Sequence, residues 1–251
     1  MLMQYILYNI DIIHSHGLIA DVYSGFTNNK KNAYRLTTLH CNLNEDYNST
    51  YRWYKYYPYL AIHKMMLKRL DKVVGVSKNA LRSINKLNIN PTYIYNGVES
   101  NPSSVKPANG KVILLYIGVL NEIKNIYFLI DQMKKVSLLN MSIELHIYGK
   151  GELEEHLKVY AKDFDNVYFK GFVESPSEFY TLNSILVSSS YSEGLPMSVI
   201  EALGSGLPAL LSNIKAHKEI KMVMNEGVEL FDFDKQSFCI ALNKILESLC
   251  D

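Results

Sequence analysis

Two glutamates stand eight positions apart in one stretch of the chain. Glu193 comes just before a helical pattern and Glu201 lies within it, in Ser190–Gly206 (SYSEGLPMSVIEALGSG). Carboxylates at one cleft can accept hydrogen bonds from the vicinal hydroxyls of a sugar and of a ribose. On spacing alone, a carboxylate at a helix start beside an unrelated surface glutamate is an equal alternative.

The turn between the two glutamates has features of a diphosphate site. An apolar run over residues 184–189 predicts a buried strand before it, and ligands of open α/β sheets bind beyond the carboxyl ends of strands. The backbone N–H groups of Gly194–Met197 would face that cleft, with the positive end of the helix dipole behind them. Gly194 allows close backbone approach, and Pro196 near the first turn loses no needed hydrogen bond.

Apolar runs of strand length alternate with amphipathic stretches of helix length along most of the chain. This alternation predicts an α/β fold with parallel sheet. Predicted helices include Ile126–Leu138, Glu152–Lys162 and Lys235–Leu249. The predicted strands are Asp11–His16, Tyr34–His40, Lys72–Ser77, Thr92–Tyr95, Lys111–Ile117, Ser142–Tyr148, Asn166–Lys170, Ser184–Ser189 and Leu207–Ser212.

A stretch rich in Pro, Ser, Asn and Gly, Asn101–Gly110, predicts a linker between two domains. We therefore expect a first domain over residues 1–105, linker included, and a second over residues 106–251. The second has the length of a Rossmann-like unit. The first offers about four strands and no glycine-rich first turn, and Met1–Asn9 is interpreted as the end of a helix. The N-terminal domain is therefore expected to be incomplete.

Composition argues against some classes of partner and some cellular compartments. The formal net charge of +1 argues against nucleic acid as a main partner. Three cysteines without zinc or redox spacing indicate a reducing compartment, so the cytoplasm is expected. The N-terminus lacks the basic region of a signal peptide, and no run approaches the ~20 apolar residues of a membrane span.

The stretch Glu193–Ala202 (EGLPMSVIEA) resembles the signature of the retaining group 1 glycosyltransferases, whose GT-B architecture has two Rossmann-like domains. Other segments resemble pieces of that family in its order, and the resemblance covers about residues 11–220. These segments are Asp11–Gly17 (DIIHSHG), Thr38–His40 (TLH), Val73–Ser77 (VVGVS), Tyr95–Val98 (YNGV), Tyr116–Asn125 (YIGVLNEIKN), Ile147–Leu153 (IYGKGEL) and Asn166–Phe172 (NVYFKGF).

The resemblance implies roles for individual residues. Glu193 would hold hydroxyls of the donor hexose, Glu201 the ribose hydroxyls, and Lys124 the donor diphosphate, countering its charge as the leaving group departs. Without the motif, a solvated Lys124 would be the better interpretation. The other donor-binding candidates are Gly118, Gly149, Gly151, Gly194, Leu195 and Pro196.

Two details qualify this donor site. Gly149 and Gly151 would border the nucleobase pocket, with a plain tight turn as an equal alternative. Directly after Gly118, where the family usually has an arginine as the second cation on the diphosphate, the chain has Val119. Loss of one charge-assisted contact of about 1.5–3 kcal/mol would weaken donor binding.

His16 matches a histidine that the family places close to the transferred sugar, so His16 and Glu193 are the catalytic candidates. By itself His16 fits a structural strand end better. His14 lies on the same strand face but the pair lacks a third metal ligand, and His40 and His63 are taken as structural. The family generally needs no metal, so neither a metal nor a cofactor is expected.

The reaction implied is transfer of a hexose-like unit from a nucleoside diphosphate sugar to an acceptor hydroxyl, with anomeric retention, in cell-surface polysaccharide or glycolipid synthesis. No nucleophilic side chain is identified, and the leaving phosphate itself would take the acceptor proton. One alternative is a non-catalytic or incomplete nucleotide-sugar-binding module, either a truncated gene product or half of a two-chain enzyme. Another is a different GT-B chemistry such as epimerisation, against which the Glu193–Ala202 pattern speaks.

The segment Tyr51–Lys72 is dense in aromatic and basic residues. Such a helix could lie on an anionic membrane surface, which would suit a lipid-linked glycan as acceptor and place the protein at the inner face of the cell membrane. A domain helix with a tyrosine-rich core face is the better-supported interpretation. The sequence names neither the donor base and sugar nor the acceptor.

Overall fold

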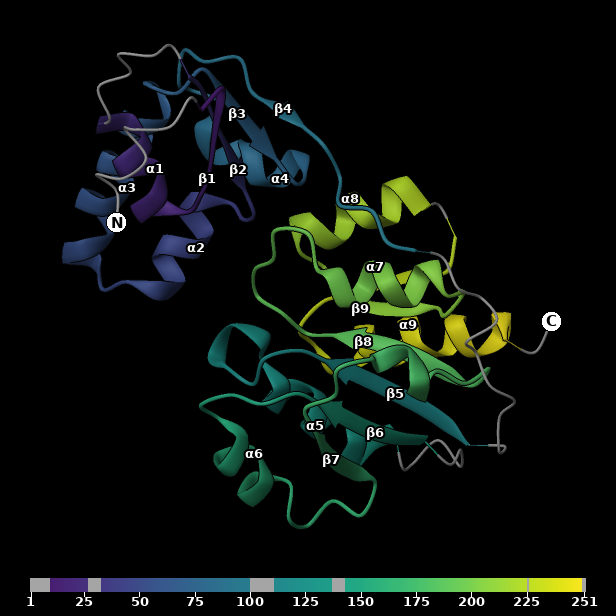
Figure 1. The fold of residues 1–251 in the computed structure, drawn as a ribbon. Helices are drawn as coiled ribbons and strands as arrows, with labels where there is room; N and C mark the ends of the chain where they lie inside the picture. The colour runs from purple at the N-terminus through teal and green to yellow at the C-terminus, as the bar shows by residue number, and fades with distance from the viewer. Residues whose placement is uncertain (1–9, 27–32, 100–110, 137–142, 225, 250–251) are drawn as a thin grey trace. The chain divides into compact units, whose positions relative to one another are not determined.

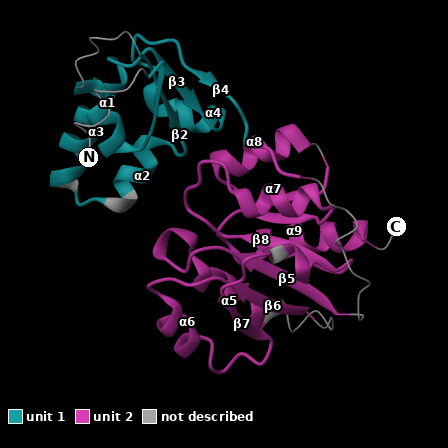
Figure 2. Cartoon of the chain, viewed as in Figure 1, with its two compact units in different colours: residues 1–96 teal, residues 97–251 magenta. Residues whose placement is uncertain are grey.

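The computed structural model describes residues 10–26, 33–99, 111–136, 143–224 and 226–249 (Figure 1). The chain divides into two compact units, Met1–Asn96 and Gly97–Asp251 (Figure 2). The predicted linker Asn101–Gly110 and the predicted helix end Met1–Asn9 lie outside the described residues, as does the predicted division at residues 105 and 106.

Unit 1 is a four-stranded sheet in the order β1-β2-β3-β4, and every strand pair is parallel. Its described helices pack an apolar cluster that includes Leu39, Leu67 and Ile84. The elements are β1 (Ile12–His16), α1 (Leu18–Phe26), β2 (Tyr34–Leu39), α2 (Leu43–Thr50), α3 (Trp53–Leu67), β3 (Lys72–Gly75), α4 (Lys78–Leu81), the 3₁₀ turn Arg82–Ile84 and β4 (Thr92–Tyr93).

Unit 2 is a six-stranded, fully parallel sheet in the order β10-β9-β8-β5-β6-β7. The chain leaves β5 toward one edge of the sheet and returns at β8 to run toward the other edge. Its elements are β5 (Val112–Ile117), α5 (Ile126–Val136), β6 (Ile143–Tyr148), α6 (Glu154–Tyr160), β7 (Val167–Gly171), β8 (Ser184–Ser188), α7 (Met197–Gly204), β9 (Ala209–Ser212), α8 (Lys215–Met224), β10 (Val228–Phe231) and α9 (Lys235–Ser248), with 3₁₀ turns at Glu122–Lys124 and Pro176–Phe179.

Successive side chains of β5 enter two different cores, which explains why this strand is apolar on both faces. Leu114 and Tyr116 belong to the cluster packed under α5, α6 and α9, whereas Leu115 belongs to the cluster packed under α7 and α8. Helices on both faces of a parallel sheet confirm the predicted α/β class.

All nine predicted strands are present, with ends that differ by up to two residues. One further strand, β10, was not predicted and pairs with β9 at the edge of the sheet. Its four residues include the half-buried Glu229 and Leu230 and give too short an alternation to stand out.

Candidate functional site

The site of unit 2 forms where β5 and β8 lie side by side. These strands are neighbours in space but are separated in the chain by two other strands, and the strand order reverses between them. Such a reversal point is where open α/β sheets bind ligands, beyond the carboxyl ends of the strands. The loop after β5 carries Lys124, and the loop after β8 carries Glu193.

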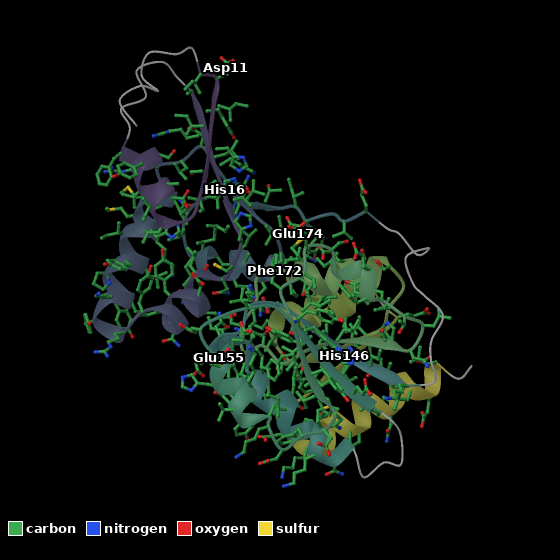
Figure 3. All side chains as sticks on the ribbon, turned by 60° about the horizontal axis from the view of Figure 1, so that its bottom comes forward. Asp11, His16, His146, Glu155, Phe172 and Glu174 are labelled. Carbon is green, nitrogen blue, oxygen red and sulfur yellow. The ribbon has the colours of Figure 1, made fainter. Side chains whose placement is uncertain are left out.

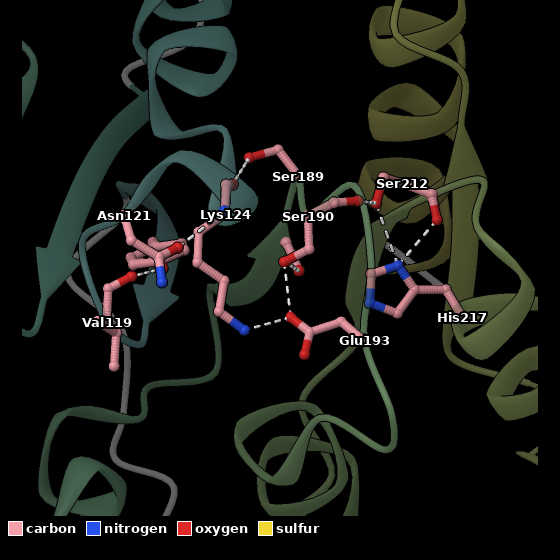
Figure 4. A network of polar contacts seen from close by, with 10 residues as sticks. Val119, Asn121, Lys124, Ser189, Ser190, Glu193, Ser212 and His217 are labelled. Atoms are coloured by element: carbon pink, nitrogen blue, oxygen red, sulfur yellow. Dashed lines mark hydrogen bonds and ion pairs between the residues drawn. The ribbon is translucent and has the colours of Figure 1, made fainter. Parts of the chain in front are cut away.

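Lys124 and Glu193 meet directly in this site (Figure 4). The Lys124 ammonium donates to Glu193 Oε1 at 2.5 Å, and the two side chains are 24% and 12% exposed. Such partial burial strengthens a charge-assisted hydrogen bond relative to a pair in open water. The structure thus brings together the two residues to which the resemblance gave the diphosphate and the sugar hydroxyls.

Backbone and hydroxyl contacts hold the two loops against each other. Asn121 caps the short turn that carries Lys124, because its side chain accepts a hydrogen bond from the Lys124 N–H at 3.2 Å. Asn125 then takes the left-handed conformation (φ 49°), which asparagine tolerates better than most residues. The Ser189 hydroxyl donates to the carbonyls of Lys124 and Asn125 at 2.8 and 2.9 Å, so the loop after β8 fixes the loop after β5.

A second set of contacts holds Glu193 from the side of β9. Ser190 Oγ donates to Glu193 Oε1 at 2.6 Å, and Ser212 Oγ donates to the Ser190 carbonyl at 2.7 Å. His217 Nδ1 in turn donates to the Ser212 carbonyl at 2.8 Å. Ser190, Ser212 and His217 were not predicted from the sequence, although both serines lie at or just beyond the carboxyl ends of predicted strands.

Burial lowers the pKa of His217 from 6.5 to about 4, opposed in part by the Ser212 carbonyl and the Glu193 carboxylate. The unfolded imidazole binds a proton below about pH 6.5 and the folded one only below about pH 4, so falling pH favours the unfolded state in that window. We expect His217 to remove about 3 kcal/mol of stability between those two pH values. Urea unfolding at several pH values measures this loss. In His217→Asn the loss of stability over the same pH range should be smaller by about 3 kcal/mol, because asparagine does not titrate. Equal losses in the wild type and the variant would show that the buried imidazole does not cause the pH dependence.

The glycines of the site serve a close crossing of two loops. A Cβ at Gly149 would lie 1.8 Å from the Gly118 carbonyl oxygen, and one at Gly151 would lie 2.2 Å from the Leu120 carbonyl oxygen. The Gly118 N–H donates to the Tyr148 carbonyl at 3.0 Å across the same crossing. Loop packing therefore requires both glycines, and their place beside a nucleobase stays a prediction.

The remaining donor-site candidates lie around the turn before α7. Gly194 and Pro196 are buried, Leu195 is half-buried, and Pro196 directly precedes the first residue of the helix. Glu201 lies within α7, half-buried and close enough to Tyr180 to help raise the pKa of that phenol, behind the larger effect of burial. Its role on the ribose stays a prediction.

Val119, at the position where the resemblance places an arginine, is a residue that is 54% exposed. Its carbonyl accepts a hydrogen bond from the Tyr116 hydroxyl at 2.8 Å. The position thus presents an apolar side chain to solvent next to the turn that carries Lys124.

In unit 1, Asp11 precedes β1 and His16 ends it (Figure 3). His16 Nδ1 lies 2.9 Å from His40 Nε2, and the His14 ring centroid lies 4.3 Å from that of His16. Burial and neighbouring histidines lower the pKa of His14 and His40. His40 therefore shares the surroundings of His16, a proximity that the parallel pairing of β1 and β2 creates.

A cavity of about 200 Å³ lies beyond the carboxyl ends of β1 and β2. Its lining includes Gly17, His40 and Tyr47. Behind it the fully buried Asp21 accepts hydrogen bonds from Ser15 Oγ and His63 Nε2, at 2.5 and 2.7 Å. His63 is thus held between Tyr47 and Asp21 at the wall of the cavity, and its structural role stays a prediction.

The described residues contain no group of three or more His, Cys, Asp or Glu side chains that could hold a metal ion. No helix in the described part of the chain has the length and apolarity to cross a membrane. Helix α3, within the aromatic and basic segment, exposes Tyr54 and Tyr57 but packs Tyr56 and Tyr59 against the core of unit 1. Membrane contact through this segment stays a prediction.

Comparison with protein families gives a match for each part of the chain. The model of glycosyl transferases group 1 matches residues 111–248, more than half of the chain. The chain belongs to the group 1 glycosyltransferases. A glycosyltransferase family 4 model matches residues 1–101.

The curated relatives of this glycosyltransferase chain include two proteins of Staphylococcus aureus that are named for work on a polymer. The chain is 24% identical over 197 residues to the poly(ribitol-phosphate) alpha-N-acetylglucosaminyltransferase of Staphylococcus aureus, covering 76% of this chain and 39% of that protein. It is 23% identical over 257 residues to the capsular polysaccharide biosynthesis glycosyltransferase CapH of the same species, covering 95% of this chain and 69% of that protein. The chain therefore spans about two fifths of the first relative and about two thirds of the second.

Solved structures show the same GT-B fold. The chain superposes on TarM with a TM-score of 0.77 at 22% identity, covering 99% of this chain and 50% of that one. It superposes on the sucrose-phosphate synthase of Thermosynechococcus elongatus with a TM-score of 0.80 at 19% identity, covering 99% of this chain and 67% of that one. On HepE of Anabaena in complex with UDP and glucose it superposes with a TM-score of 0.74 at 15% identity, covering 94% of this chain and 68% of that one.

Proposed function

We propose that the chain transfers a sugar from a nucleoside diphosphate sugar to an acceptor hydroxyl during synthesis of a cell-surface polysaccharide, in the cytoplasm and with retention of anomeric configuration. The observation that carries this proposal is the Lys124–Glu193 pair at the strand-order reversal of unit 2. Relatives named for poly(ribitol-phosphate) and capsule synthesis support the polymer class. A HepE structure with UDP and glucose supports a uridine donor.

In this mechanism the ion pair exchanges partners when the donor binds. The diphosphate brings two negative charges toward the Lys124 ammonium, and the sugar brings hydroxyl donors to the Glu193 carboxylate. The ammonium then stabilises charge on the departing nucleoside diphosphate, and such electrostatic stabilisation is usually what lowers the barrier most at a site of this kind. We propose that the donor is held without a metal, by the lysine, by Glu201 on the ribose and by the turn before α7.

One observation favours a second candidate, a donor-binding module without turnover of its own. Strand β1 lies at the edge of the described unit 1 sheet, and its residue Ile12 is 59% exposed. An exposed edge strand is a ready surface for pairing with another polypeptide. In that case unit 2 would bind the donor, while transfer would need residues from elsewhere.

Release of UDP or GDP from UDP-N-acetylglucosamine, UDP-glucose and GDP-mannose tests the proposal, with water as acceptor of the sugar. We expect one donor to be hydrolysed and the α-anomer to form first, as seen by proton NMR before mutarotation. Glu193→Gln should slow release by about 100-fold, because one oxygen that accepts hydroxyl hydrogen bonds is replaced by an amide. First formation of the β-anomer would refute retention, and tight binding without release would favour the second candidate.

A further inference from the structure

His217 is fully buried in α8, between the apolar neighbours of that helix's inner face, Ala216 and Ile220. A buried imidazole is a poor choice for packing alone, because its polar atoms must find partners. Its Nδ1 donates to the Ser212 carbonyl, while Nε2 has no hydrogen-bond partner among the described residues. Figure 4 shows this second nitrogen on the side of the ring that faces Glu193.

The hydrogen bonds from His217 to Glu193 run in one direction. A carbonyl oxygen only accepts, so Nδ1 of His217 carries the proton toward Ser212, and Ser212 Oγ donates onward to the Ser190 carbonyl. Ser190 Oγ then donates to Glu193 Oε1, which also accepts from Lys124. The carbonyls of Ser212 and Ser190 only accept, so these contacts act as successive restraints that link the buried ring of His217 to the Glu193 carboxylate.

We infer that His217 is a positioning residue, which holds Glu193 through Ser212 and Ser190 in the orientation that receives the hydroxyls of the donor sugar. The inference rests on the proposed function. His217 itself does not touch the donor. It fixes the end of β9, which fixes the loop after β8, and so determines where the Glu193 carboxylate points.

Two substitutions separate this role from packing. In His217→Asn the amide nitrogen takes the place of Nδ1 and can still donate to Ser212, whereas His217→Leu fills the space without a donor. The readout is the ratio of the dissociation constants of UDP and of the UDP-sugar that binds best, because only the sugar moiety meets Glu193. Calorimetry measures both constants on the full 251-residue chain.

We expect His217→Leu to lower this ratio by about tenfold while the affinity for UDP alone changes little, and His217→Asn to keep most of it. In Ser190→Ala the ratio should fall similarly, and the double variant with His217→Leu should fall no further, since both break one chain. An unchanged ratio in His217→Leu, or additive losses in the double variant, would overturn the inference.

A second measurement needs no donor. In protein labelled with ¹⁵N-histidine, Glu193→Gln should move the resonances of the His217 Nδ1–H, because the ring loses the electrostatic influence of the Glu193 carboxylate and the contacts that join the two residues rearrange. Unmoved resonances would overturn the inference by themselves. If the folded wild-type chain binds no UDP-sugar, the proposed function fails, and this experiment still decides whether His217 and Glu193 are coupled.

Discussion

Replacing Gly149 by alanine is expected to destabilise unit 2 by about 4 kcal/mol or more, the range that marks a severe backbone conflict. The new Cβ would lie 1.8 Å from the Gly118 carbonyl oxygen, a backbone atom that no side-chain rotation can move away. Gly149 also has a φ of 138°, which L side chains rarely adopt. Urea unfolding followed by circular dichroism measures the change in the free energy of unfolding.

Gly171→Ala is the matched control for this experiment. Gly171 has a positive φ of 74°, but a Cβ there would meet no atom within 4 Å. Gly171→Ala should therefore lower the free energy of unfolding only by the left-handed backbone penalty of about 1–2 kcal/mol. Equal destabilisation by the two alanines would show that the crossing of the loops after β5 and β6 does not depend on close backbone approach.

The substitution Lys124→Met is expected to raise the dissociation constant for UDP and for a UDP-sugar by about 10–100-fold. Methionine keeps much of the apolar stem and removes the ammonium, so the diphosphate loses its cation. The loss matters more here than in other members of the family, because Val119 stands where they usually supply a second cation. Calorimetric titration of both ligands measures the effect.

Lys158→Met provides the control for charge. Lys158 lies on α6, and its ammonium pairs with Glu154 at 2.8 Å at an exposed position. This variant also loses one positive charge, yet its ligand affinities should match those of the wild type. Wild-type affinity in Lys124→Met, or an equal loss in Lys158→Met, would remove Lys124 from the diphosphate site.

Much of the fold was predictable from the sequence because each buried strand leaves an apolar run between two helical patterns. The predicted run Lys111–Ile117 contains β5, and Ser184–Ser189 contains β8. Their pairing was not predictable from the residues, because strands adjacent in space are here far apart in the chain. The resemblance to the family assigned Lys124 and Glu193 to one site, and the pairing of β5 with β8 supplies the physical reason.

The supporting residues escaped prediction for a different reason. Ser190 and Ser212 are small polar residues that meet each other only because β8 and β9 are paired, and nothing local distinguishes them from serines of ordinary turns. His217 is flanked in the sequence by Lys215 and Lys218, a pattern typical of an exposed helix face, yet α8 turns it inward. The crowded Gly149 likewise depends on a neighbouring loop, so only the packed structure reveals what it does.

The most direct test of the donor site is calorimetric titration of the 251-residue chain with UDP-glucose, UDP-N-acetylglucosamine, GDP-mannose and their free nucleotides, repeated on Glu201→Ala. We predict saturable binding of one nucleotide and its sugar, weakened about tenfold or more in Glu201→Ala through loss of the ribose contact. Equal binding by the two proteins would remove Glu201 from the site, and no binding by a folded wild-type chain would contradict the assignment of unit 2 as the donor-binding unit.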